Sequence, residues 1–126
     1  MMPAIDPTKK YQTSNGGDTL PVLCAYSTAT VGANRQLVAA QTGKRIRLMG
    51  WILQANGAGL SGVTFKDGNG GSTLCLLNIT PNTNGANDKL PIVDSGYFET
   101  TAGNGLYADI ATTDLLATIF YIAYVP

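Results

Sequence analysis

The chain has 126 residues and no formal net charge, because eight basic residues balance eight acidic ones. This length suits one domain with one hydrophobic core. Charged residues make up 13% of the chain, about half the usual share, so composition provides no electrostatic attraction to nucleic acid or to an anionic membrane.

The residue types of common active sites are scarce. Histidine is absent and Glu99 is the only glutamate, which removes the commonest general base and the simplest carboxylate pair. No apolar run approaches the roughly 20 residues of a membrane helix, and residues 1–10 lack the apolar region of a signal peptide. We therefore expect no enzyme, no catalytic residues, no cofactor, no metal, no membrane contact and no export by the Sec pathway.

Residues 1–19 differ from the rest of the chain. Two prolines and two adjacent glycines interrupt any regular element, and little apolar material is available for burial. One interpretation is a loosely attached terminus. The other is an extended arm that orders on a neighbouring subunit, with Ile5 and Tyr11 as its contact residues.

From residue 20 onward the sequence predicts short strands separated by glycine-rich turns. No segment shows an apolar stripe with helical spacing, and the strands recur every 8 to 14 residues or so, which is typical of a sandwich or jelly roll. We predict an all-β protein, with an extended N-terminal arm over residues 1–19 and a jelly-roll-like β-sandwich of about eight strands over residues 20–126. The predicted strands are 20–26, 36–40, 44–55, 63–66, 72–79, 90–93, 97–99, 106–110 and 116–125. Residues 28–34, 55–62 and 80–88 are predicted as loops.

The strand predicted over residues 44–55 has two apolar faces. With regular alternation, Ile46 and Leu48 form a core face, while Met49, Trp51 and Leu53 share the other face with Arg45 and Arg47. These outward residues then contact a partner. Alternatively, a β-bulge at Gly50 reverses the alternation and returns Trp51 to the core. The final strand, 116–125, is also apolar on both faces, which favours a central position or a subunit contact.

Three other features of the sequence each allow two interpretations. The segment 67–71, Asp-Gly-Asn-Gly-Gly, predicts a tight hairpin rather than a calcium loop, because no later bidentate carboxylate follows it. Cys24 and Cys75 are either buried reduced thiols or a disulfide. The basic cluster of Arg35, Lys44, Arg45 and Arg47 is either a solvated sheet edge or a patch for an acidic partner surface.

Three stretches resemble small all-β domains of tailed-bacteriophage virions, above all capsid decoration (cement) proteins. They are residues 38–53, which include a Gly-Lys turn into an Ile-x-Leu strand, the Val-Thr-Phe-Lys segment 63–66, and the Tyr-Phe-Glu-Thr segment 97–100. The resemblance covers roughly residues 36–125 and offers no catalytic residue. It implies a jelly-roll homotrimer that binds the major capsid protein at the virion surface after assembly in the host cytoplasm.

On this basis we expect a virion structural protein that binds the capsid shell as a trimer and stabilises it. One alternative is a β-domain of a tail or fibre. An alternative of another class is a carbohydrate-binding module, for which Tyr26, Tyr97, Tyr107, Tyr121 and Tyr124 are the candidate platform residues.

Overall fold

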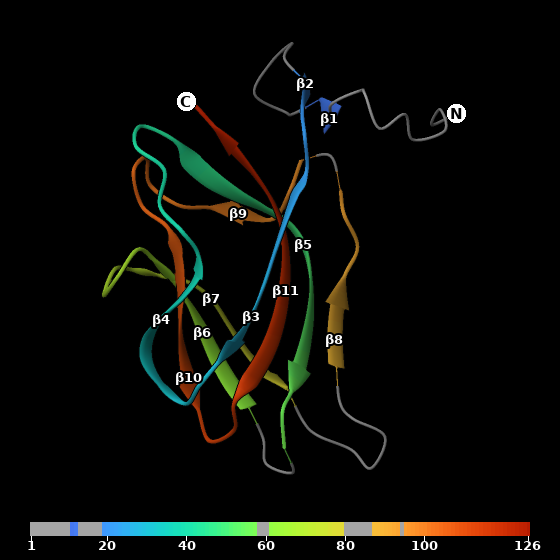
Figure 1. Cartoon of the computed structure of the whole chain (residues 1–126), viewed down its shortest axis with the longest axis vertical. Helices are drawn as coiled ribbons and strands as arrows, with labels where there is room; N and C mark the ends of the chain where they lie inside the picture. Colours follow the sequence, from blue (N-terminus) through green and yellow to red (C-terminus); the bar gives the residue numbers. More distant parts are fainter. Residues whose placement is uncertain (1–10, 13–18, 58–60, 80–86, 94) are drawn as a thin grey trace.

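The computed structural model describes residues 11–12, 19–57, 61–79, 87–93 and 95–126, and these form strands joined by turns (Figure 1). The described ranges contain no helix, and so none that could cross a membrane. The all-β prediction is confirmed. The strands are β1 (Tyr11–Gln12), β2 (Thr19–Leu20), β3 (Leu23–Ala29), β4 (Gly32–Val38), β5 (Arg45–Ala55), β6 (Ser61–Asp67), β7 (Thr73–Ile79), β8 (Asn87–Leu90), β9 (Phe98–Glu99), β10 (Leu106–Ala111) and β11 (Leu115–Tyr124).

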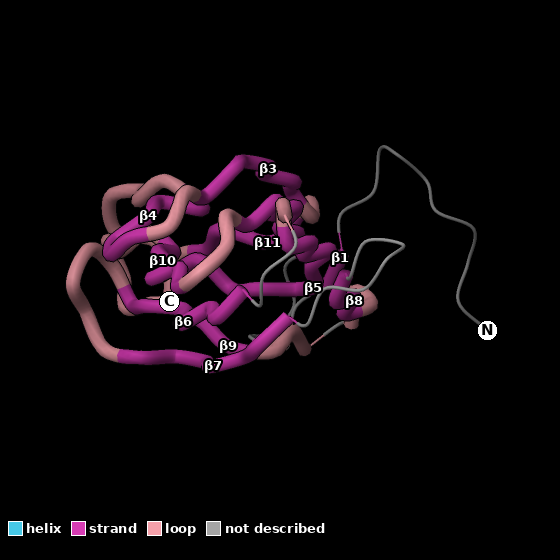
Figure 2. Tube along the Cα trace, turned by 90° about the horizontal axis from the view of Figure 1, so that it is seen from below, coloured by secondary structure: helices cyan, strands magenta, loops and turns pink. Residues whose placement is uncertain are grey.

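Two antiparallel sheets form the body of the protein (Figure 2). The β11 sheet has the order β3-β11-β5-β8, with β9 also paired to β5, and the β10 sheet has the order β4-β10-β6-β7. The pairs are nested along the chain: β6 with β7, β5 with β8, β4 with β10, and β3 with β11. Nested pairs distributed over two sheets are the arrangement of a long hairpin rolled into an eight-stranded jelly roll. The predicted jelly-roll-like sandwich is confirmed.

Residues 67–71 form the tip of this rolled hairpin. The amide of Asp67 donates to the carbonyl of Ser72 at 2.8 Å, and the amide of Gly71 donates to the carbonyl of Gly68 at 3.3 Å. Gly68 and Gly70 have φ of 81° and 75°, values that glycine adopts without a steric cost. The predicted hairpin is therefore present.

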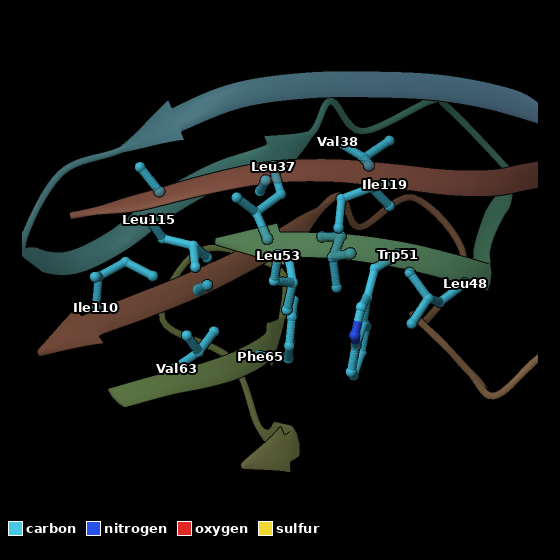
Figure 3. Packing of buried hydrophobic residues seen from close by; sticks show 14 of the residues in the cluster. Leu37, Val38, Leu48, Trp51, Leu53, Val63, Phe65, Ile110, Leu115 and Ile119 are labelled. Atoms are coloured by element: carbon cyan, nitrogen blue, oxygen red, sulfur yellow. The ribbon is translucent and has the colours of Figure 1, made fainter. Parts of the chain in front are cut away.

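One main core fills the space between the two sheets. The rings of Trp51 from β5 and Phe65 from β6 stack at a centroid distance of 5.1 Å and an angle of 10° (Figure 3). Phe98 packs against both rings, at 6.3 Å from Trp51 and 5.7 Å from Phe65. Aliphatic side chains from β4, β5, β6, β10 and β11 complete the core.

A β-bulge divides β5 into two halves. Gly50 lies opposite Phe120, whereas Leu48 lies opposite Tyr121, so Met49 is an extra residue on β5. Leu48 and Trp51 consequently share the main core, which is the second of the two alternatives predicted for this strand.

The bulge corrects the idea that Met49, Trp51 and Leu53 form one outward face. Trp51 and Leu53 are buried in the main core, and Met49 is buried on the opposite side of the sheet. All three side chains are buried and offer no surface to a partner in this structure.

Gly50 is needed at the bulge because another strand approaches it closely. A Cβ atom at this position would lie 2.7 Å from the carbonyl oxygen of Leu90 and 3.2 Å from the amide nitrogen of Ile92. We predict that Gly50→Ala lowers the free energy of unfolding by about 1–3 kcal/mol, the usual cost of overpacking. Urea denaturation followed by circular dichroism measures this loss.

Gly62→Ala is the matched control for Gly50→Ala. A Cβ at Gly62 would meet Ala111 and Asn78 at 3.4 Å, an ordinary contact. Equal destabilisation by the two substitutions would show that loss of a strand glycine, rather than the approach of Leu90, causes the effect.

Some predicted boundaries are wrong. The predicted loop 28–34 is mostly strand, because β3 continues to Ala29 and β4 begins at Gly32. β8 includes Asp88, which the sequence predicts as a loop residue. Both errors have the same physical cause: polar residues in these strands either face solvent or find a partner. Asp88, for example, accepts a hydrogen bond of 2.6 Å from the indole nitrogen of Trp51.

The two cysteines lie on different sheets, Cys24 on β3 and Cys75 on β7, and both are free thiols. The reduced alternative is the one observed. Cys24 is exposed, so the expected burial of both residues is wrong for this one. Cys75 packs against the main core, and burial raises the pKa of its thiol.

Candidate functional site

The outer face of the β11 sheet is half covered by the chain itself. Met49, Ile122 and Tyr124 are buried there, on the side of the sheet that faces away from the main core. Leu20 and Val22, from the segment that leads into β3, pack over them together with Phe120. This second cluster explains why β11 is apolar on both faces.

No described residue covers the other half of this outer face. The register places Tyr26 opposite Thr118, Thr118 opposite Ile52, and Ile52 opposite Lys89 at the sheet edge, which makes one row across four strands. Tyr26 is 83% exposed, and Ile52 and Ile92 are each 41% exposed. We call this area the outer-face patch and define it as Cys24, Tyr26, Ile52, Ile92, Leu116, Thr118 and Phe120.

The outer-face patch is a shallow, mainly apolar surface rather than an enclosed substrate pocket. A hollow of about 410 Å³ lies beside Tyr26, lined by β3 and by the segment 116–118 of β11. All seven residues of the patch are uncharged, and a patch of this kind at a protein surface marks an interaction site.

The basic cluster predicted from the sequence does not form one surface. Arg35 lies on β4 in the β10 sheet, whereas Arg45 and Arg47 lie on β5 in the β11 sheet. The Arg35 guanidinium donates to the carbonyls of Thr30 at 3.0 Å and Val31 at 2.7 Å, across the turn between β3 and β4.

Arg45 and Arg47 are joined to Glu99. Arg45 Nη1 lies 3.0 Å from Glu99 Oε1, and Arg47 donates from Nε at 3.1 Å and from Nη2 at 2.9 Å to Glu99 Oε2. The Tyr124 hydroxyl donates to the same Oε2, and the Arg47 guanidinium lies over the Tyr124 ring at 5.1 Å. Glu99 therefore already forms ion pairs with Arg45 and Arg47, the two arginines predicted as contacts for an acidic partner.

The environment of Glu99 favours its ionised form. Burial acts in the opposite direction, but the Tyr124 hydroxyl and the charges of Arg47 and Arg45 outweigh it and lower the pKa of the Glu99 carboxyl. The hydrogen bonds that Glu99 accepts from Arg45, Arg47 and Tyr124 thus connect β9, β5 and β11 at the edge of the second hydrophobic cluster.

The five candidate platform tyrosines do not lie together. Tyr124 is buried and Tyr121 packs against the main core, while Tyr107 lies on the β10 sheet with its hydroxyl donating to Gln36 at 3.0 Å. Tyr97 donates to the carbonyl of Pro91 at 2.7 Å, and Tyr26 is highly exposed. The ring pairs in the described part of the chain involve only core aromatics.

The oxygens of Asp67 hold a neighbouring loop. Oδ1 accepts from the amide of Thr101 at 2.8 Å and from Asn104 Nδ2 at 3.1 Å, and Oδ2 accepts from the Thr101 hydroxyl at 2.5 Å. Burial opposes ionisation, but these hydrogen bonds outweigh it and lower the pKa of Asp67. Within the described ranges no three metal-ligating side chains of the His, Cys, Asp or Glu type gather.

The remaining predicted contact residues belong to the N-terminal segment. Ile5 lies outside the described residues, and so does the side chain of Tyr11. The backbone of Tyr11 belongs to β1, which pairs with β2. A contact role for the arm stays a prediction.

No protein-family model and no curated protein matches this chain. The outer-face patch is therefore the feature that the structure itself contributes to a functional proposal. Sequence reasoning did not single it out as one surface, because its members come from β3, β5, β11 and the segment after β8.

Proposed function

We propose that the protein is a virion structural protein, namely a capsid decoration protein that binds the major capsid shell as a trimer and stabilises it at the capsid surface. One observation carries the proposal: the outer face of the β11 sheet is half covered by residues 20–22, and among the described residues its other half exposes Tyr26 and Ile52. A jelly roll by itself specifies no function. This surface and the resemblance of residues 36–125 to phage decoration proteins support the proposal.

The proposed mechanism is mechanical. The outer-face patch lies against a capsid subunit and continues the burial that Leu20 and Val22 begin on the same sheet. A stable interface of standard size buries about 800 Å² per partner. Three copies acting together gain strength by multivalency, so each single contact can be modest. The proposal assigns no catalytic residue, no cofactor and no nucleic acid partner.

A tail or fibre location is the alternative for the same surface. Imaging of the native particle separates the two, since density at three-fold positions of the shell supports decoration and density on the tail contradicts it. The tyrosines do not favour a carbohydrate-binding role, because Tyr124 is buried, Tyr121 packs against the main core and Tyr107 lies on the other sheet.

The test is the double variant Tyr26→Asp with Ile52→Asp. Both side chains are exposed, on β3 and β5, the two strands that flank β11, so we expect normal folding but loss of at least about tenfold in affinity for capsid shells, since each buried unpaired carboxylate costs more than about 1.4 kcal/mol. Co-sedimentation with shells of the native particle measures the affinity.

Thr64→Asp is the control for this double variant. Thr64 lies on β6, opposite Leu76 on the outer side of the other sheet, and its replacement is expected to leave binding unchanged. Unchanged shell binding by the folded double variant would overturn the assignment of the outer-face patch.

A further inference from the structure

One edge of the β10 sheet is an unprotected strand. β7 is the last strand in the order β4-β10-β6-β7, and no described strand pairs with its other side. It follows the margin of the molecule in Figure 2. Its sequence, Thr-Leu-Cys-Leu-Leu-Asn-Ile, contains no charge and no proline, and Leu76 is 70% exposed. Edges of this kind are templates for pairing with another strand.

The other edges carry features that discourage pairing. β8 contains Asp88 and Lys89, and Pro91 follows it. β4 is irregular, because its register with β10 shifts twice and Asn34 has a φ of 58°. β3 is uncharged, but its second half consists of small and polar residues. β7 is thus the most apolar edge of the sandwich.

We propose that β7 pairs with β7 of a second copy of this chain, antiparallel and about a two-fold axis at Leu76. This register places Leu76 opposite its own copy and Cys75 opposite Leu77 of the partner. The two β10 sheets then join into one continuous sheet. Opposed residues in an antiparallel pair have Cα atoms about 4.5–5.5 Å apart, so the two Leu76 side chains cover each other.

A second copy suits this edge better than a charged partner. Both strands of the pair are uncharged, so no charged side chain is left unpaired and no like charges are opposed. The contact is isologous, because the same residues serve both copies. Leu74 is an extra residue on β7, because Cys75 lies opposite Phe65 and Thr73 opposite Lys66. The two-fold axis brings one Leu74 to each end of the paired segment, so the regular pairing is limited to residues 75–77.

The proposed contact is independent of the outer-face patch, which lies on the other sheet. It also gives a two-fold contact, which a closed trimer does not itself require. Copies held in trimers on a shell can therefore use β7 to join neighbouring trimers.

A register-specific cross-link tests the proposal. In a variant with Cys24→Ser and Cys75→Ala, we add Leu76→Cys and oxidise the protein. Residues at the proposed axis lie within the Cα range of about 4.4–6.8 Å that a disulfide requires, so we expect a covalent dimer as the main product. The control is Asn78→Cys, whose own copy lies four residues away along the strand, about 13 Å, and is expected to stay uncross-linked.

Analytical ultracentrifugation of the unmodified chain at about 100 µM adds a second measurement; at a Kd well below that concentration the dimer dominates by mass action. A mass of two copies of the 13.2 kDa chain, or of six where trimers are joined, supports the proposal, and so does conversion to monomer or single trimer by Leu76→Lys in a variant with an unchanged circular dichroism spectrum. A monomer or a single trimer of the unmodified chain overturns it, as does a dimer that cross-links through Asn78→Cys as readily as through Leu76→Cys.

Discussion

Trp51→Ala is expected to lower the free energy of unfolding by about 3–5 kcal/mol, the usual cost of removing a large aromatic side chain from a core. The indole is 4% exposed and stacks on Phe65, with Phe98 against both rings, so its loss leaves a cavity between the sheets. Its hydrogen bond to Asp88 is lost as well, which removes one tie between β5 and β8. The midpoint of urea denaturation, followed by far-ultraviolet circular dichroism, measures the change.

Trp51→Phe separates the two contributions. Phenylalanine retains a ring next to Phe65 but cannot donate to Asp88, so we expect a loss of about 1.5–3 kcal/mol, the range for a hydrogen bond to a charged group. If Trp51→Ala were no more destabilising than Trp51→Phe, the stacked rings would contribute little and the proposed role of the aromatic core would be wrong.

Glu99→Gln is expected to cost about 2–3 kcal/mol at neutral pH, because it removes the charge that the Arg47 guanidinium faces. The Arg47 side chain is only 11% exposed, so water replaces the carboxylate poorly. Arg45 is 37% exposed, and its share of the cost is expected to be small. Arg45→Gln is therefore the matched control, with a loss below that of Glu99→Gln in the same denaturation experiment.

The same carboxylate makes stability depend on pH. The folded pKa of Glu99 lies below its unfolded value, so the unfolded chain binds the proton first as the pH falls. The contribution of Glu99 to the free energy of unfolding is complete above the ordinary glutamate pKa of about 4.3, and it is lost as the pH falls through the lowered pKa of the folded state. Asp67 acts in the same direction.

Denaturation midpoints at pH 6 and pH 3 test the assignment to Glu99. We expect Glu99→Gln to lose less stability than the unmodified protein over this interval, while the part that Asp67 contributes is retained. The same loss in both proteins would mean that Glu99 does not contribute to the acid sensitivity.

The fold class was predictable because its signals are local. Alternating apolar residues indicate strands, and the glycines of segment 67–71 indicate a hairpin. Strand boundaries were harder to predict, since Asp88 looks like a loop residue until Trp51 is placed beside it. The β-bulge at Gly50 was stated only as an alternative, because the approach of Leu90 that requires glycine there is a tertiary contact.

The candidate surface was less predictable than the fold. The sequence groups the arginines of β5 into a basic cluster, yet their partner, Glu99, lies more than 50 residues away and forms part of a short strand. The outer-face patch brings together Tyr26, Ile52 and Ile92, whose proximity depends on the pairing of β11 with β3 and β5. Its one local signal was the final strand with two apolar faces.

The nested strand order has a consequence for how the chain folds during synthesis. β11 lies between β3 and β5 and pairs with both. Neither β3 nor β5 can therefore join the β11 sheet on that side until β11 has been synthesised. Until then the apolar side chains of the earlier strands stay exposed to solvent. β proteins whose strands pair over long sequence distances fold slowly and tend to aggregate in this state. The tip at residues 67–71 and the β6–β7 pair need no later strand, so this hairpin is the part that can form first.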